Sequence, residues 1–519
     1  MNPRRKSVYS PQWLACPLLF VTGLAGQSVQ TVSGQLEGAK SADGKVRIYK
    51  GIPFAAPPVG ELRWKAPQPA AKWSGVRQAN EFGGRCMQGR PYPDMVFRDA
   101  GPSEDCLYLN VWTPAASARE RLPVMVWIYG GGFAAGATSE PRQDGEALAR
   151  KGVVVVSMNY RLGVFGFFAN TELAKESGHG ASGNYGLMDQ TAALAWVRDN
   201  IAAFGGDTKK VTIVGESAGS FSVSAQMAAP SAQGLFQRAI GESGAFFGNT
   251  LALKSLEESE VADAKLTESV GAHSLAELRA QPAQELLDAS LKMGGPGQFT
   301  ANVDGYFLPA TVKKIFEEGS QSKVPLLAGW NADESNYRSV LANWPATAEN
   351  FAVRVRALYG TDAGTVLKLY SGETDDQVKR AAQDLASDRF IAFGTWKWIE
   401  MQAAAKEPVW RYRFDQSAPG GMGAVHALEI EFVFQTLRSK KVDWAPEDFK
   451  LSELIADYWT NFAKTGNPNG KGLPEWPQYT GGRKVMHLSH APKVTVDDGR
   501  ARYAFLDGFG AVDAPPRRH

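Results

Sequence analysis

The sequence predicts an α/β fold built on a large, mostly parallel central sheet flanked by helices. Two observations carry this prediction: short apolar runs end at turn residues, and segments with helical periodicity alternate with them. The apolar runs are 123–129 (PVMVWIY), 153–159 (VVVVSMN), 211–215 (VTIVG) and 325–329 (PLLAG). Continuous apolar runs of this length are typical of strands buried on both faces of a parallel sheet. Alternating strands and helices imply right-handed crossovers.

Other segments have helical or strand patterns of their own. In 187–201 the apolar residues recur with helical spacing and form one face. These residues are Leu187, Leu194, Val197 and Ile201. Residues 409–414 (VWRYRF) predict a later strand, and 451–466 predict a helix that a glycine ends. The charged, helix-rich region 251–319 predicts an insertion beside the sheet.

The composition is that of an ordinary globular protein, with 44% of the 519 residues hydrophobic and 21% charged. No stretch has the character of a linker, a repeat or a low-complexity segment, so we expect residues 26–519 to form a single domain. The segment 1–25 holds three basic and no acidic residues, which leaves 53 basic residues against 54 acidic ones. This balance does not favour nucleic acid or an anionic membrane surface as a partner.

The segment 1–25 itself has the pattern of a secretory signal peptide. Three basic residues at positions 4–6 precede an apolar run over 13–25, whose last residues, GLA, offer a small-residue cleavage site. The run is shorter than the roughly 20 residues that a membrane span needs. We therefore expect a protein that is secreted or periplasmic after cleavage, without a membrane span.

Cysteine usage agrees with export. Beyond the signal segment only Cys86 and Cys106 remain. Two cysteines in an exported protein predict one disulfide. The chain has no Cys-x-x-Cys motif and no cluster of cysteine and histidine, so the sequence does not predict a metal site.

A serine lies where the strand 211–214 passes directly into a helical pattern. Ser217 is flanked at two residues' distance by Gly215 and Gly219, and a tight strand-to-helix turn needs small residues at those places. The helix N-terminus would favour negative charge developing beside the serine. We interpret Ser217 as a nucleophile; the alternative is a purely structural turn. A similar segment at 241–245 (GESGA) lacks the second glycine.

A glycine run follows the strand at 123–129. Acyl transfer passes through an oxyanion and needs N–H donors aimed at it. Glycines at 130–132 let backbone N–H groups face a cavity without side chains in the way. We expect Gly131, Gly132 and Ala218, the residue after the serine, to form an oxyanion hole; the alternative for the glycines is a flexible loop.

A serine nucleophile needs a base, and histidine is the usual one near neutral pH. In this kind of fold the base follows the serine and the acid in chain order. His426 fits best, because it lies in a loop after the strand 409–414. The other five histidines fit less well. His179 and His273 come too early in the chain, His487 and His490 lie in a segment that reads as a late edge strand, and His519 is the terminal residue.

The acid that orients the base should lie between the serine and the histidine. The strand 325–329 leads into the segment 330–335 (WNADES), which contains Asp333 and Glu334. Either carboxylate can hold the imidazole tautomer and stabilise the imidazolium. The residues alone leave both open.

These motifs together resemble the type-B carboxylesterase and lipase family, which includes the cholinesterases. The segments 204–219 (FGGDTKKVTIVGESAG) and 104–114 (EDCLYLNVWTP) look like the two signatures of that family. The resemblance extends from about Val32 to the C-terminal region. Within the family, the sequence is most similar in character to bacterial secreted members. It implies an α/β-hydrolase fold with helical insertions.

The resemblance also implies roles for single residues. It assigns the acid to Glu334, the base to His426, and pairs Cys106 with Cys86. Two positions depart from the family, which commonly has glycine where this chain has Ser335 and Ala427. Both departures enlarge the wall of the site and affect the expected shape of the substrate more than the reaction.

The reaction that these motifs imply is hydrolysis of a small-molecule carboxylic ester through a Ser-His-Glu triad and an acyl-enzyme, without a cofactor or metal. One alternative is an amidase or peptidase on the same fold. Another is a non-catalytic, cholinesterase-like binding protein, but such relatives typically lose triad residues that this chain retains.

Overall fold

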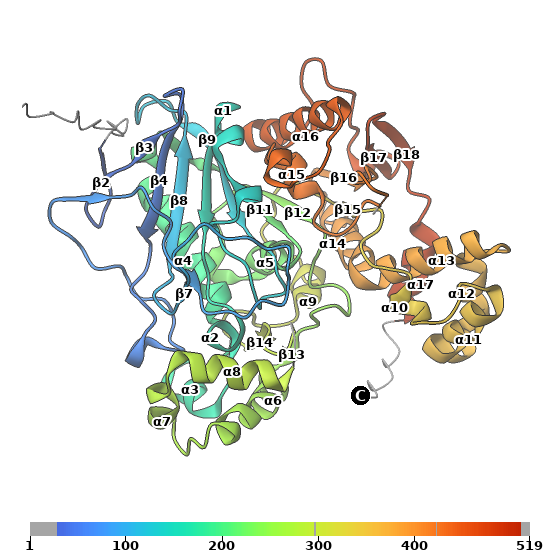
Figure 1. Cartoon of the computed structure of the whole chain (residues 1–519), viewed down its shortest axis with the longest axis horizontal. Helices are drawn as coiled ribbons and strands as arrows, with labels where there is room; N and C mark the ends of the chain where they lie inside the picture. Colours follow the sequence, from blue (N-terminus) through green and yellow to red (C-terminus); the bar gives the residue numbers. More distant parts are fainter. Residues whose placement is uncertain (1–27, 295–296, 422, 510–519) are drawn as a thin grey trace, which may run out of the picture.

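The structure is a computed structural model that describes residues 28–294, 297–421 and 423–509. An eleven-stranded sheet runs through it, in the order β18-β17-β16-β15-β12-β11-β9-β10-β8-β4-β3 (Figure 1). Its strands are β3 (Ala39–Lys40), β4 (Arg47–Pro53), β8 (Tyr108–Thr113), β9 (Leu122–Ile128), β10 (Val154–Met158), β11 (Gly206–Glu216), β12 (Arg238–Glu242), β15 (Leu326–Asn331), β16 (Val409–Phe414), β17 (Lys484–Leu488) and β18 (Lys493–Val496). The predicted α/β-hydrolase fold is confirmed.

The middle of the sheet is parallel and its edges are antiparallel. All neighbours from β10 to β17 pair in parallel, whereas β10–β8, β8–β4, β4–β3 and β17–β18 are antiparallel. Every residue of β10 and of β15 is buried, as expected for apolar strands covered on both faces. The carboxyl ends of the parallel strands therefore converge at one edge, where α/β proteins place their ligands.

Helices cover the sheet. The predicted helices are present as α4 (Tyr185–Asn200) and α16 (Pro446–Thr465), and Gly466 in the left-handed conformation ends α16. Helix α5 (Ala218–Ala228) packs on β11 and β12, α14 (Phe393–Ala404) on β15 and β16, and α16 on β9 and β11.

Two helical lobes flank this core (Figure 1). The region 251–319 contains α6 (Leu256–Ser269), α7 (Leu275–Ala280), α8 (Ala283–Met293) and α9 (Val312–Glu317), together with a short pairing of β13 (Lys254–Ser255) and β14 (Asn302–Val303). The predicted insertion is thus helical but includes extended segments.

The second lobe was not predicted. It comprises α10 (Arg338–Leu341), α11 (Ala348–Tyr359), α12 (Ala363–Leu369) and α13 (Asp375–Ser387), and it has a hydrophobic core of its own. We call it the α10–α13 lobe. Leu506 of α17 (Arg500–Phe509) belongs to the same core, so the lobe is completed by a helix from the C-terminal end of the chain.

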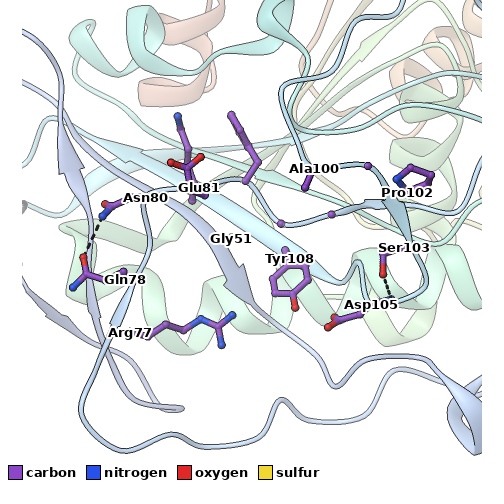
Figure 2. Close-up of a pocket in the computed structure, with 15 residues that line it drawn as sticks. Gly51, Arg77, Gln78, Asn80, Glu81, Ala100, Pro102, Ser103, Asp105 and Tyr108 are labelled. Carbon is purple, nitrogen blue, oxygen red and sulfur yellow. Dashed lines mark hydrogen bonds between the residues drawn. The ribbon is translucent and has the colours of Figure 1, made fainter.

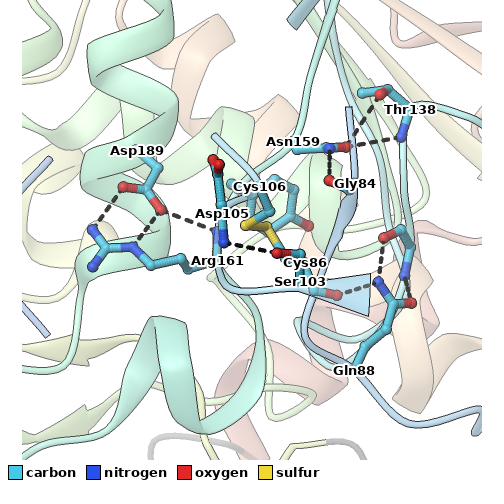
Figure 3. The surroundings of a disulfide bond; sticks show 12 residues. Gly84, Cys86, Gln88, Ser103, Asp105, Cys106, Thr138, Asn159, Arg161 and Asp189 are labelled. Atoms are coloured by element: carbon cyan, nitrogen blue, oxygen red, sulfur yellow. Dashed lines mark hydrogen bonds and ion pairs between the residues drawn. A yellow bond between two sulfur atoms is a disulfide. The ribbon is translucent and has the colours of Figure 1, made fainter. Parts of the chain in front are cut away.

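The predicted disulfide between Cys86 and Cys106 is present (Figure 3). The loop that it closes is tied to the core near the disulfide, where Gln88 exchanges two hydrogen bonds with the backbone of Gly136. The predicted signal segment 1–25 lies outside the described residues. Within the described ranges, no helix combines the length and the apolar character needed to span a bilayer.

Candidate active site

Ser217 lies on a strained turn between β11 and α5. Its backbone has φ 53° and ψ −124°, a region that residues other than glycine rarely adopt. A Cβ on Gly219 would lie 1.9 Å from the carbonyl oxygen of Ile128, and one on Gly215 would lie 2.4 Å from the backbone of Gly219. The two glycines of the motif are therefore a steric requirement of the turn.

His426 connects Ser217 to Glu334. Its Nε2 is 2.9 Å from Ser217 Oγ, and its Nδ1 is 2.5 Å from Glu334 Oε2. The three side chains come from segments that follow β11, β15 and β16, so the parallel sheet brings together residues far apart in the sequence. This geometry suits a nucleophile, a base and an orienting acid.

Glu334 is enclosed by hydrogen-bond donors. Its side chain is fully buried, and its Oε1 accepts from the backbone N–H of Asn331 and from Ser243 Oγ, each at 2.6 Å. Ser243 belongs to the GESGA segment that resembles the serine elbow. It also has a positive φ, 57°, but its hydroxyl binds the acid. The GESGA segment, which resembles the elbow, therefore helps to hold Glu334 in place.

Glu216 is a second carboxylate beside the histidine, which sequence reasoning missed. It is 3% exposed, and its Oε1 lies 3.3 Å from His426 Nε2. Burial raises the pKa of Glu216 to about 7. The positive charge of a protonated His426 acts in the opposite direction and lowers this pKa. The available signal in the sequence was the position of Glu216, directly before Ser217 at the end of a buried strand.

The electrostatics of His426 have opposing causes. Burial by itself lowers the pKa of the imidazole, but the carboxylates of Glu216 and Glu334 stabilise the imidazolium more strongly and raise this pKa. Glu429, one turn further along the chain, accepts hydrogen bonds from Ser243 and Asn331, and burial raises its pKa well above the ordinary value.

The predicted oxyanion donors lie beside the elbow. Gly131 and Gly132 have φ of 102° and 63°, and a Cβ on Gly131 would lie 2.1 Å from the carbonyl oxygen of Ala135. In the described part of the chain no acceptor engages the N–H of either glycine. Ala218 is the first residue of α5, where an N–H has no intrahelical partner.

The other described histidines lie outside this group. His487 lies on β17, which pairs with both β16 and β18, so the expected edge strand is wrong for this residue: the edge is β18. Its side chain has the expected structural role, with hydrogen bonds to Asp415 at 2.6 Å and to Thr495 at 2.8 Å. His490 bonds to Asp448, and His179 stacks on the exposed Tyr306.

A cleft of about 710 Å³, whose lining is drawn in Figure 2, has none of Ser217, Glu334 and His426 among its lining residues. Its lining includes Lys50, Arg77, Glu81, Asp105 and Tyr108. At the triad itself, the ring of Phe390 meets His426 edge-on at 5.3 Å. Among the described residues, no cluster of three or more histidines, cysteines and carboxylates could hold a metal ion.

Comparison with known proteins gives consistent results. A family model described as "Carboxylesterase family" matches residues 25–506. The chain is 37% identical over 472 residues to fumonisin B1 esterase of Sphingopyxis macrogoltabida, covering 88% of this chain and 85% of that protein. It is also 37% identical over 472 residues to para-nitrobenzyl esterase of Bacillus subtilis (strain 168), covering 87% and 92%.

Solved structures agree with these matches. The crystal structure of the carboxylesterase EST55 of Geobacillus stearothermophilus at pH 6.2 superposes with a TM-score of 0.81 at 36% sequence identity. The match covers 92% of this chain and 99% of that one.

Proposed function

Because the chain belongs to the carboxylesterase family and is a carboxylesterase, we propose that it cleaves esters through an acyl-enzyme formed on Ser217. The observation that carries this proposal is the continuous hydrogen-bonded path from Ser217 Oγ through both ring nitrogens of His426 to Glu334. A serine, an imidazole and a buried carboxylate in this order activate a hydroxyl that is otherwise a weak nucleophile.

The proposed reaction has two steps. His426 Nε2 takes the proton of Ser217 as its Oγ attacks the ester carbonyl, and the N–H groups of Gly131, Gly132 and Ala218 hold the oxyanion. The imidazolium then protonates the departing alcohol. Water, deprotonated by the same nitrogen, attacks the acyl-enzyme and releases the acid, which restores the serine.

The substrate is proposed to be a small-molecule ester. Two relatives are named for esters of this kind, a fumonisin and a para-nitrobenzyl compound. The chain's disulfide supports the proposal that the protein works in an oxidising compartment outside the cytosol. Sequencing the N-terminus of protein recovered from an exporting host tests this point, since a chain that still begins at Met1 contradicts it.

A panel of nitrophenyl esters tests the reaction, with wild type measured beside Ser217→Ala. We expect turnover to be lost in Ser217→Ala and retained in a matched control, Ser231→Ala, where an exposed serine is replaced. Equal turnover by Ser217→Ala and wild type contradicts the mechanism. Nitroanilides of the same acids form a further arm, and faster cleavage of the anilide than of the ester would assign the protein to the amidases instead.

A further inference from the structure

In its described residues, 415–421 and 423–428, the loop that carries His426 contains no helix or strand. It joins β16 to α15 (Glu429–Val433), and Gly420, Gly421 and Gly423 within it have φ between 76° and 88°. Ala427, next to the histidine, also has a positive φ of 65°. A glycine-rich loop has many accessible conformations, so contacts from elsewhere must hold the imidazole in line.

Asp333 makes those contacts. Its Oδ2 accepts from the backbone N–H of Ala424 at 2.9 Å, and its own N–H donates to the carbonyl oxygen of Ala424 at 3.0 Å. A β-bridge pairs Asp333 with Val425. Gly423 makes the approach possible, because a Cβ there would lie 2.5 Å from Asp333 Oδ2.

The adjacent carboxylates therefore engage the histidine at different levels. Glu334 binds the imidazole itself, and Asp333 binds the backbone two residues before it. Asn331 adds a third link, since its Nδ2 donates to the carbonyl oxygen of Val425 at 2.8 Å.

Asp333 is held in turn from the α10–α13 lobe. Arg380 of α13 donates from Nη1 to Asp333 Oδ1 at 2.6 Å and from Nη2 to the carbonyl oxygen of Ala332 at 3.2 Å. Gln383, one turn along the same helix, accepts from the N–H of Tyr337 at 2.8 Å. The segment after β15 is thus fastened to α13 on both sides of Glu334.

We propose that Asp333 is a positioning residue for the hydrolysis: held by Arg380, it fixes the loop that presents His426 to Ser217. The α10–α13 lobe is then part of the apparatus that aligns the base. This proposal rests on the function proposed above. It assigns Asp333, the alternative to Glu334 that the sequence left open, a role distinct from that of Glu334.

The test compares Asp333→Ala, Arg380→Ala and the double variant in the full-length protein, with nitrophenyl acetate as substrate. Misplacing a base by about 1 Å can cost 10²-fold, so we expect Asp333→Ala to lower kcat by about 10- to 100-fold, with KM within about 2-fold of wild type. Arg380 is half exposed and acts through Asp333, so Arg380→Ala should lower kcat by only about 5-fold.

The double variant should have nearly the kcat of Asp333→Ala, because the Asp333 carboxylate, through which the side chain of Arg380 acts on Ala424, is already missing in Asp333→Ala. Asp333→Asn, which keeps an acceptor for the N–H of Ala424, should recover part of the loss. Multiplicative losses in the double variant, or a fall in KM alone, would overturn the proposal.

Leu266→Ala is the control for stability. Leu266 is fully buried in α6, outside the α10–α13 lobe and outside the residues proposed to position His426, so the variant should lower Tm and keep kcat at temperatures where it is folded. Wild-type kcat in folded Asp333→Ala would refute the positioning role and leave the proposed function intact. Unchanged turnover in Ser217→Ala would refute the function itself.

Discussion

The elbow at Ser217 and the loop at His426 bring two side chains to one point by opposite means. The elbow is defined within five residues, where Gly215 and Gly219 allow a backbone turn that no larger residue fits. The loop carries its own glycines but takes its orientation from Asn331, Asp333 and Glu334. The position of Ser217 is therefore a local property, whereas the orientation of His426 is a property of the assembled sheet ends.

The largest effect should come from breaking the elbow. In Gly219→Ala the new methyl group would lie 1.9 Å from the carbonyl oxygen of Ile128 and 2.8 Å from its carbonyl carbon, so the backbone of the turn would have to shift. We expect turnover to fall by at least about 10³-fold, or folded protein to be lost, because overpacking against backbone displaces the turn.

The measurement is turnover together with thermal unfolding. Gly364→Ala is the matched control, because a Cβ there would meet no atom within 4 Å and the residue lies in α12. It should be as stable as wild type or gain up to about 1 kcal/mol. Wild-type activity in Gly219→Ala would show that the turn is not locally determined.

The next effect comes from removing the charge that orients the base. Glu334→Gln keeps the size of the side chain but offers the imidazole an amide, so both the tautomer and the stabilisation of the imidazolium are lost. We expect kcat to fall on the order of 10³–10⁴-fold with little change in KM. Glu373→Gln, at an exposed position, should match wild type. A loss below tenfold would contradict the assignment of the acid.

A smaller effect should appear in the pH profile of Glu216→Gln. The base works only as neutral imidazole, so kcat/KM falls as the pH falls through the pKa of His426. Glu216 helps to raise that pKa, and therefore its removal should move the acid limb to lower pH, by about one pH unit. An acid limb at the same pH in both proteins would show that Glu216 does not act on the base.

The smallest effect on activity is expected from the disulfide. Cys86→Ser combined with Cys106→Ser opens a loop whose ends are 20 residues apart, which should cost about 3 kcal/mol of unfolding free energy. Since neither sulfur touches the elbow or the histidine loop, kcat in the folded protein should stay within about twofold of wild type. Urea unfolding and turnover at a permissive temperature test this, and a tenfold loss of kcat would contradict it.

The local features of the fold could be predicted from the sequence. The central strands are present at their predicted places. Their apolar runs are buried on both faces, and such a run is recognisable in the sequence without knowing which strands pair with it. Ser217 was identifiable because its two glycines stand at a fixed spacing in the chain. Glu216 was missed because its partner is 210 residues away in the sequence, although it stands next to Ser217.

The features that depend on distant contacts could not be predicted from the residues. Asp333 and Glu334 are adjacent and chemically alike. The pairing of Asp333 with the histidine loop and the hydrogen bonds that Glu334 accepts from Asn331 and Ser243 determine which carboxylate faces the imidazole. The α10–α13 lobe was not anticipated because its core is completed by Leu506 of α17, more than a hundred residues further along.

Covalent labelling tests the convergence of the elbow and the loop most directly. A fluorophosphonate, which reacts only with an activated serine, is incubated with wild type, Ser217→Ala and His426→Gln, and the modified peptide is identified by mass spectrometry. We predict one label per chain on Ser217 in wild type, none in Ser217→Ala and much slower labelling in His426→Gln. Labelling of another serine, or labelling of Ser217 at an unchanged rate without the histidine, would contradict the account.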